Sequence, residues 1–138
     1  MRWIDFIDYG MGLYSNTIIV SKKLATDNPA AVKGFLRALN KGMIDVIKDP
    51  DAGIAAVVKR EPLLNAAFEK DSLSMAMKGD INHPEIAKIG LGNVDTARLS
   101  ASIDILTDAY QLPNKPKVED IFNTSFLPPV ADLPKKLF

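Results

Sequence analysis

The stretch that decides the fold is Leu13-Tyr14-Ser15-Asn16-Thr17-Ile18-Ile19-Val20, which differs in character from the rest of the 138-residue chain. It is rich in β-branched and aromatic residues, and Gly10 and Gly12 precede it. This composition predicts one extended β-strand over residues 13–20, entered through a flexible turn. A lone strand leaves its backbone donors and acceptors unpaired, and the sequence offers this strand no obvious partner.

From Ser21 onward the apolar residues recur at steps of three and four, which predicts helices. The pairs Asn28-Pro29 and Asp49-Pro50 are typical of helix starts, because the first side chain caps free amides and proline fits the first turn. The residues alone therefore predict a mostly α-helical chain with one main β-strand. Two helices are expected to begin at residues 29 and 50. Two more are expected over about 64–79 and over 99–110, with short helical turns after residue 83 and over 118–122. The tail from 113 is expected to be mainly irregular.

Composition excludes several classes of function. The 17 basic and 17 acidic residues balance, so there is no basic surface for nucleic acid and no polybasic segment for an anionic membrane. The absence of cysteine excludes disulfides, thiolate nucleophiles and Cys-based zinc sites. No apolar run approaches the ~18 residues of a membrane span. The acids near the N-terminus interrupt the apolar core that a signal peptide needs, so no export signal is expected in the chain as given.

The residue types that carry catalysis are sparse. His83 is the only histidine and precedes Pro84, a position typical of helix capping rather than of catalysis. No spacing suggests further metal ligands around it. The acids Asp49 and Asp51 fit a helix start, and the glycines do not form a phosphate loop. We therefore expect no catalytic residue, no metal and no cofactor, and the chain is not expected to be an enzyme.

Aromatic residues gather near the N-terminus and indicate a candidate binding zone. Trp3, Phe6, Tyr9 and Tyr14 lie close together in the sequence, and rigid aromatic walls with a few polar groups are typical of pockets for small planar molecules. Tyr9, Tyr14 and Asn16 are the candidate ligand-binding residues. An equally good interpretation is that these rings fill a core or a contact between two lobes.

Two stretches of the chain, which together with the segments between them cover most of it, resemble a known family. Asp8-Tyr9-Gly10, the stretch 13–20 and the helix start at Asn28-Pro29 resemble the segment of ABC-transporter substrate-binding proteins that returns from the second lobe to the first. The similarity is to the thiamine-precursor, sulfonate, nitrate and taurine types. The helix starts at Pro29 and at Asp49-Pro50 fit the same family, and the segments 99–110 and 121–128 resemble its closing part.

The resemblance implies a bilobed α/β protein with a type II periplasmic-binding fold, of which residues 1–138 are one C-terminal segment. It divides the chain into a lobe-crossover region with the strand (1–22), a helical part (23–112) and an irregular tail (113–138). It implies capture of a small organic ligand, planar or anionic, between two lobes for ABC-type import through a membrane permease. Location in the periplasm or otherwise outside the cytoplasm is implied too, with Tyr9, Tyr14 and Asn16 near the ligand.

Two alternatives stay open. The family also resembles an enzyme that synthesises the thiamine pyrimidine, but that enzyme needs a histidine and a cofactor-anchoring lysine in an N-terminal part that this sequence does not contain. The third interpretation is a helical interaction domain, in which the strand pairs with its copy in a homodimer.

Overall fold

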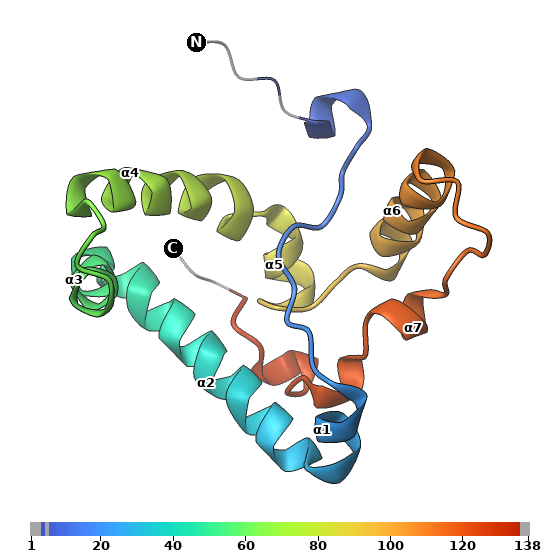
Figure 1. Ribbon diagram of the computed structural model, residues 1–138, viewed down its shortest axis with the longest axis horizontal. Coiled ribbons are helices and arrows are strands. Elements are labelled where there is room, and N and C mark those ends of the chain that lie inside the picture. Colours follow the sequence, from blue (N-terminus) through green and yellow to red (C-terminus); the bar gives the residue numbers. More distant parts are fainter. Residues whose placement is uncertain (1–3, 5, 136–138) are drawn as a thin grey trace.

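The computed structural model describes residue 4 and residues 6–135, and these residues form a chain of helices joined by short turns (Figure 1). The helices α2, α3 and α4 follow one another around one side of the molecule, while α6 and α7 lie on the other side (Figure 1). The N-terminal segment descends between these two sides and passes α5 (Figure 1). The α-helices are Lys22–Asp27 (α1), Pro29–Lys48 (α2), Pro50–Arg60 (α3), Ala66–Ala76 (α4), Pro84–Ile89 (α5), Thr96–Ala109 (α6) and Val118–Ile121 (α7).

Short helical turns complete the regular structure. A π-helical stretch, Met77–Ile81, continues α4, and 3-10 turns occupy Phe6–Tyr9, Thr124–Phe126 and Val130–Asp132. The expectation of a mostly helical chain is therefore confirmed over the described residues.

The predicted β-strand over residues 13–20 is wrong. The segment is extended but forms no sheet, and no strand occurs elsewhere in residue 4 or residues 6–135. Within the described part of the chain, the backbone of residues 15–20 makes no hydrogen bond to other backbone groups. Composition favours an extended conformation, but a strand exists only where a second strand pairs with it. Ile18 and Ile19 are 47% and 89% exposed, so the middle of the segment also lacks a packing face.

The helix starts follow the capping pattern of the sequence. The Asn28 side chain accepts a hydrogen bond from the Ala31 amide at 3.1 Å, and Asp49 accepts one from Ala52 at 3.0 Å. Each cap precedes a proline in the first helical turn, where the missing amide costs nothing. The helices expected at residues 29 and 50 are thus confirmed, and each begins where local chemistry satisfies its free amides.

The closing segment is fixed by contacts with the turn between α5 and α6. The Leu91 amide donates to the Pro134 carbonyl at 2.8 Å, and Leu133 is buried. Gly90 has a φ of +84°, and a Cβ added there would lie 2.3 Å from the Leu133 Cβ. Only glycine accommodates both the left-handed backbone and this close approach.

The core is small. Among the described residues, five hydrophobic side chains are buried: Val32, Leu91, Leu99, Ile103 and Leu133. The accessible surface of the chain is 10513 Å². A compact monomer of 15.1 kDa exposes about 7,100 Å² by the usual scaling of area with mass. The fold is therefore open, and many apolar side chains lie on its surface.

Candidate functional site

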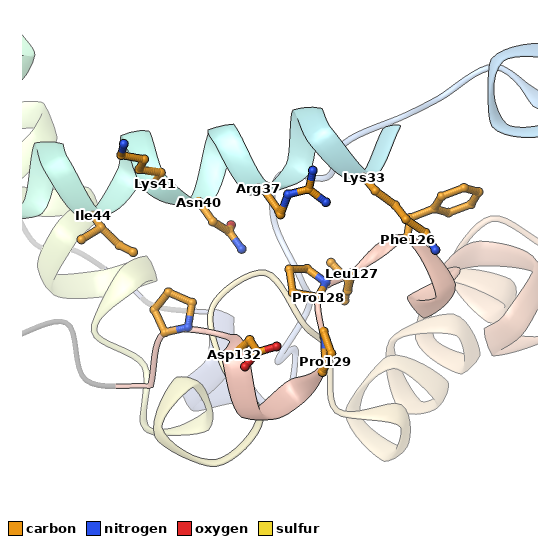
Figure 2. A pocket seen from close by; sticks show the side chains of 11 residues that line it. Lys33, Arg37, Asn40, Lys41, Ile44, Phe126, Leu127, Pro128, Pro129 and Asp132 are labelled. Carbon is orange, nitrogen blue, oxygen red and sulfur yellow. The ribbon is translucent and has the colours of Figure 1, made fainter. Parts of the chain in front are cut away.

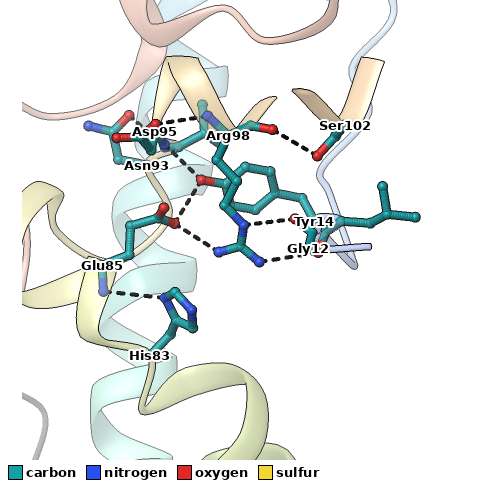
Figure 3. A network of polar contacts seen from close by, with 10 residues as sticks. Gly12, Tyr14, His83, Glu85, Asn93, Asp95, Arg98 and Ser102 are labelled. Carbon is teal, nitrogen blue, oxygen red and sulfur yellow. Dashed lines mark hydrogen bonds and ion pairs between the residues drawn. The ribbon is translucent and has the colours of Figure 1, made fainter. Parts of the chain in front are cut away.

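A polar network joins the N-terminal segment to α5 and α6 (Figure 3). The Tyr14 hydroxyl donates to Glu85 Oε2 at 2.7 Å and accepts from the Asp95 amide at 2.8 Å. Glu85 lies in the first turn of α5, and Asp95 is the N-cap of α6. Tyr14 therefore binds the starts of two helices to one extended segment.

Arg98 forms the second half of the network. Its Nε donates to the Gly12 carbonyl at 2.9 Å, and one terminal nitrogen donates to the Leu13 carbonyl at 3.3 Å. The other terminal nitrogen lies 3.2 Å from Glu85 Oε2 in a half-buried ion pair. The guanidinium carbon is 4.4 Å from the centre of the Tyr14 ring, which places the cation over the aromatic face. Arg98 thus satisfies carbonyls that would otherwise be available to a neighbouring strand.

The helix caps position these side chains. Asp95 Oδ1 accepts a hydrogen bond from the Arg98 amide at 2.9 Å, and this bond fixes the start of α6. The His83 ring accepts one from the Glu85 amide at 3.3 Å at the start of α5. The expectation that His83 caps a helix is confirmed.

Burial, together with the hydrogen bond to Glu85, raises the pKa of Tyr14 from 10.0 to about 12, although the Asp95 amide and the Arg98 charge oppose the shift. The phenol is therefore neutral near neutral pH and keeps the proton that it donates to Glu85. This electrostatic environment suits a structural contact rather than a proton-transfer group.

A hollow of about 320 Å³ borders the network on the side of α6. Its lining includes Ile7, Gly12, His83, Arg98 and Ser102. The Ser102 hydroxyl donates to the Arg98 carbonyl at 2.9 Å, so this hydroxyl is engaged within α6. The hollow can hold a small molecule or water. Among residue 4 and residues 6–135, no group of three potential metal-binding side chains occurs.

The three candidate ligand-binding residues differ in how far they are exposed to solvent. Tyr14 is half-buried in the network, whereas Tyr9 is 73% exposed and Asn16 is exposed. None of the three lines the hollow beside the network. Their role in binding a ligand stays a prediction, while Tyr14 also fulfils the alternative expectation of an internal contact. Trp3, the first member of the aromatic group, lies outside the described residues.

Sequence reasoning missed Glu85 and Arg98. They lie 71 and 84 residues after Tyr14, and neither has a motif around it that signals a partner so far away in the chain. The only local signals were Pro84, which precedes Glu85, and Asp95, which caps the helix of Arg98. These residues indicate where the helices start but not what the helices contact.

Comparison with known proteins gives one match. Residues 1–53 match the family model described as NMT1/THI5 like. No curated protein and no solved structure matches the chain. The matched residues include the extended segment, α1, α2 and the three candidate ligand-binding residues. The resemblance drawn from the sequence is thus confirmed over these residues: the chain carries an NMT1/THI5-like segment, consistent with part of a substrate-binding protein of that type.

Proposed function

We propose that the chain acts as part of a solute-binding protein that captures a small organic molecule for ABC-type import. The observation that carries this proposal is the NMT1/THI5-like match over residues 1–53. The proposal includes a membrane permease as partner, a location outside the cytoplasm and no catalytic activity of the chain itself. No helix among the described residues is long and apolar enough to cross a membrane.

The open surface supports this reading. The chain exposes 10513 Å², against about 7,100 Å² for a compact monomer of its mass. Phe35 in α2 and Phe68 in α4 are 54% and 69% exposed, and exposed apolar surface is typical of protein that packs against another domain or partner. In the proposal, the exposed faces of the helices contact the remainder of a bilobed protein.

The network around Tyr14 supports a division of roles within the binding zone. Its hydroxyl proton is committed to Glu85, so Tyr14 acts as a positioning residue that holds the extended segment. Tyr9 and Asn16 are exposed on either side of this anchor and are the residues proposed to contact the ligand. The exposed Tyr9 ring offers a face on which a planar ligand could stack, and the Asn16 amide offers a donor and an acceptor to a polar group.

Thermal unfolding with added solutes tests the proposal. Uncharged pyrimidines are added to the 138-residue chain, because a ligand that binds only the folded state raises Tm. At a hundredfold excess over Kd, such a ligand adds about 2.7 kcal/mol to the free energy of unfolding. Tyr9→Ala should abolish the rise. Tyr110→Ala is the matched control, since Tyr110 is equally exposed at 74% but lies outside the matched segment. If no solute raises Tm, or if both variants respond alike, the chain does not bind ligand through this zone.

A second candidate function is self-association through the extended segment. The unpaired backbone of residues 15–20 and the exposed Ile18 and Ile19 favour it, because an extended edge can pair with its copy across a two-fold axis. Sedimentation velocity distinguishes the two functions. A dimer that Ile19→Lys converts to a monomer supports pairing, and a monomer at all concentrations excludes it.

A further inference from the structure

A second hollow, of about 460 Å³, lies between α2 and the tail residues 126–134, and we call it the α2–tail groove (Figure 2). Its helical wall carries Lys33, Arg37 and Lys41. These cations are spaced by four residues, which places them along one face of α2. In the described part of the chain none of them has a carboxylate within 4.0 Å. The helical wall is therefore a row of uncompensated positive charge.

The opposite wall is apolar and fixed in place. Phe126, Leu127 and Pro128 are half-buried and line it, followed by Pro129. The proline rings restrict the backbone here, and the buried Leu133 ties the tail to the turn after α5. This wall thus offers a rigid surface for an apolar body.

A neutral polar group lies between the two walls. The Asn40 side chain points from α2 toward Pro128 and Asp132 (Figure 2). No hydrogen bond among the described residues uses its amide, although it is half-buried near Gly92. Asp132 is the single carboxylate in the lining, set against three cations, so the groove stays net positive.

We propose that the α2–tail groove binds a small organic anion with an apolar body, such as an aryl sulfonate or aryl carboxylate. The anionic group would lie at Arg37 and Lys33, and the apolar body would contact Phe126 and Leu127. The volume falls within the roughly 300–1,000 Å³ of small-molecule sites, and the pairing of apolar walls with a few polar groups is typical of them. The site is separate from the Tyr9 and Asn16 zone, so it stands or falls independently of the proposed function.

An amide-resolved NMR titration of the 138-residue chain tests this site. The probes are naphthalene-2-sulfonate and the uncharged naphthalene-2-sulfonamide, which share one apolar body. We expect the sulfonate to shift amides of α2 and residues 126–134, to bind roughly tenfold more tightly than the sulfonamide, and to weaken as salt is added. Equal binding of the two probes, shifts centred on Tyr9 and Asn16, or no shifts would overturn the proposal.

Charge variants sharpen the test. Arg37→Gln should weaken sulfonate binding roughly threefold to tenfold, whereas Arg60→Gln, which removes an exposed arginine from α3 outside the groove, should not change it. Asp132→Asn should tighten binding about twofold, because it removes a repelling carboxylate. Lys33→Gln repeats the test should Arg37→Gln fold poorly. A small-molecule site would be contradicted if Arg60→Gln weakened sulfonate binding as much as Arg37→Gln does. It would also be contradicted if an acidic hexapeptide bound the groove more tightly than the sulfonate.

Discussion

At the residue scale, the Tyr14 hydroxyl links three segments of the chain through one oxygen. It donates to Glu85 and accepts from Asp95, and its ring lies beneath Arg98. Replacing Tyr14 with phenylalanine removes both hydrogen bonds but keeps the ring. The remaining partners are half-buried, so they lose hydrogen bonds without fully regaining water.

We therefore expect Tyr14→Phe to lower the free energy of unfolding by about 1–3 kcal/mol in urea titrations. Tyr9→Phe is the control, since Tyr9 is 73% exposed and should change stability by less than about 0.5 kcal/mol. Equal stability of the two variants would show that the two hydrogen bonds of the Tyr14 hydroxyl contribute nothing to folding.

The raised pKa of Tyr14 predicts a pH dependence at the alkaline end. The folded chain holds the phenolic proton up to about pH 12, while the unfolded chain releases it near 10.0. Between these values the folded state binds more protons, so stability falls as pH rises. The contribution is fully present below about pH 10 and is lost by about pH 12.

Ultraviolet titration of tyrosinate checks this expectation. Subtracting the Tyr14→Phe curve from that of the parent chain should isolate one group with a midpoint near 12. A difference curve with its midpoint near 10 would mean that the Tyr14 hydroxyl is neither buried nor bonded to Glu85.

The sequence allowed part of this site to be predicted. Tyr14 stood out because an aromatic residue next to glycines in an extended stretch is conspicuous. Glu85 and Arg98 did not, since a glutamate and an arginine in the first turn of a helix are also typical of solvent-exposed faces. The distance along the chain between Tyr14 and these residues hides the contact from any local pattern.

At the scale of elements, the turn between α5 and α6 depends on Gly90. Alanine there would combine a left-handed φ of +84° with a Cβ 2.3 Å from that of Leu133. We expect Gly90→Ala to cost about 1–3 kcal/mol and to release the closing segment. Gly42→Ala is the matched control, because nothing lies within 4 Å of a Cβ at this position of α2.

Gly42→Ala should instead stabilise the chain by about 0.5–1 kcal/mol, through the higher helix propensity of alanine. Chemical denaturation of both variants, with amide exchange of Leu91 as a probe of tail docking, measures the contrast. Equal effects of the two substitutions would rule out the close approach at Gly90.

The elements themselves differ in how far the sequence determines them. The starts of α2 and α3 were predictable, because the Asn28 and Asp49 caps act within three residues. The unpaired state of residues 13–20 was not predictable, because the formation of a strand depends on a partner that no local composition encodes. The prediction succeeded where bonds are local and failed where they are not.

At the scale of the whole molecule, the excess of surface predicts behaviour in solution. A compact chain of 138 residues has a radius of gyration of about 14 Å. The open arrangement of the helices should give a larger value in X-ray scattering at low concentration. Addition of a partner that covers the exposed faces should reduce the area accessible to solvent, and a radius near 14 Å for the chain alone would contradict the open fold.

The network of Tyr14 and Arg98 also has a kinetic consequence. The bonds that tie the N-terminal segment to α5 and α6 join residues 71 to 86 positions apart, so each closes a long loop of chain and carries the corresponding loss of entropy. The helices form from contacts within a few residues and should appear first. In pulse-labelled hydrogen exchange, the Asp95 amide should therefore gain protection after the amides within α2, and simultaneous protection would argue against this order. The N-terminal segment would then be the last part of the chain to dock and the first to detach.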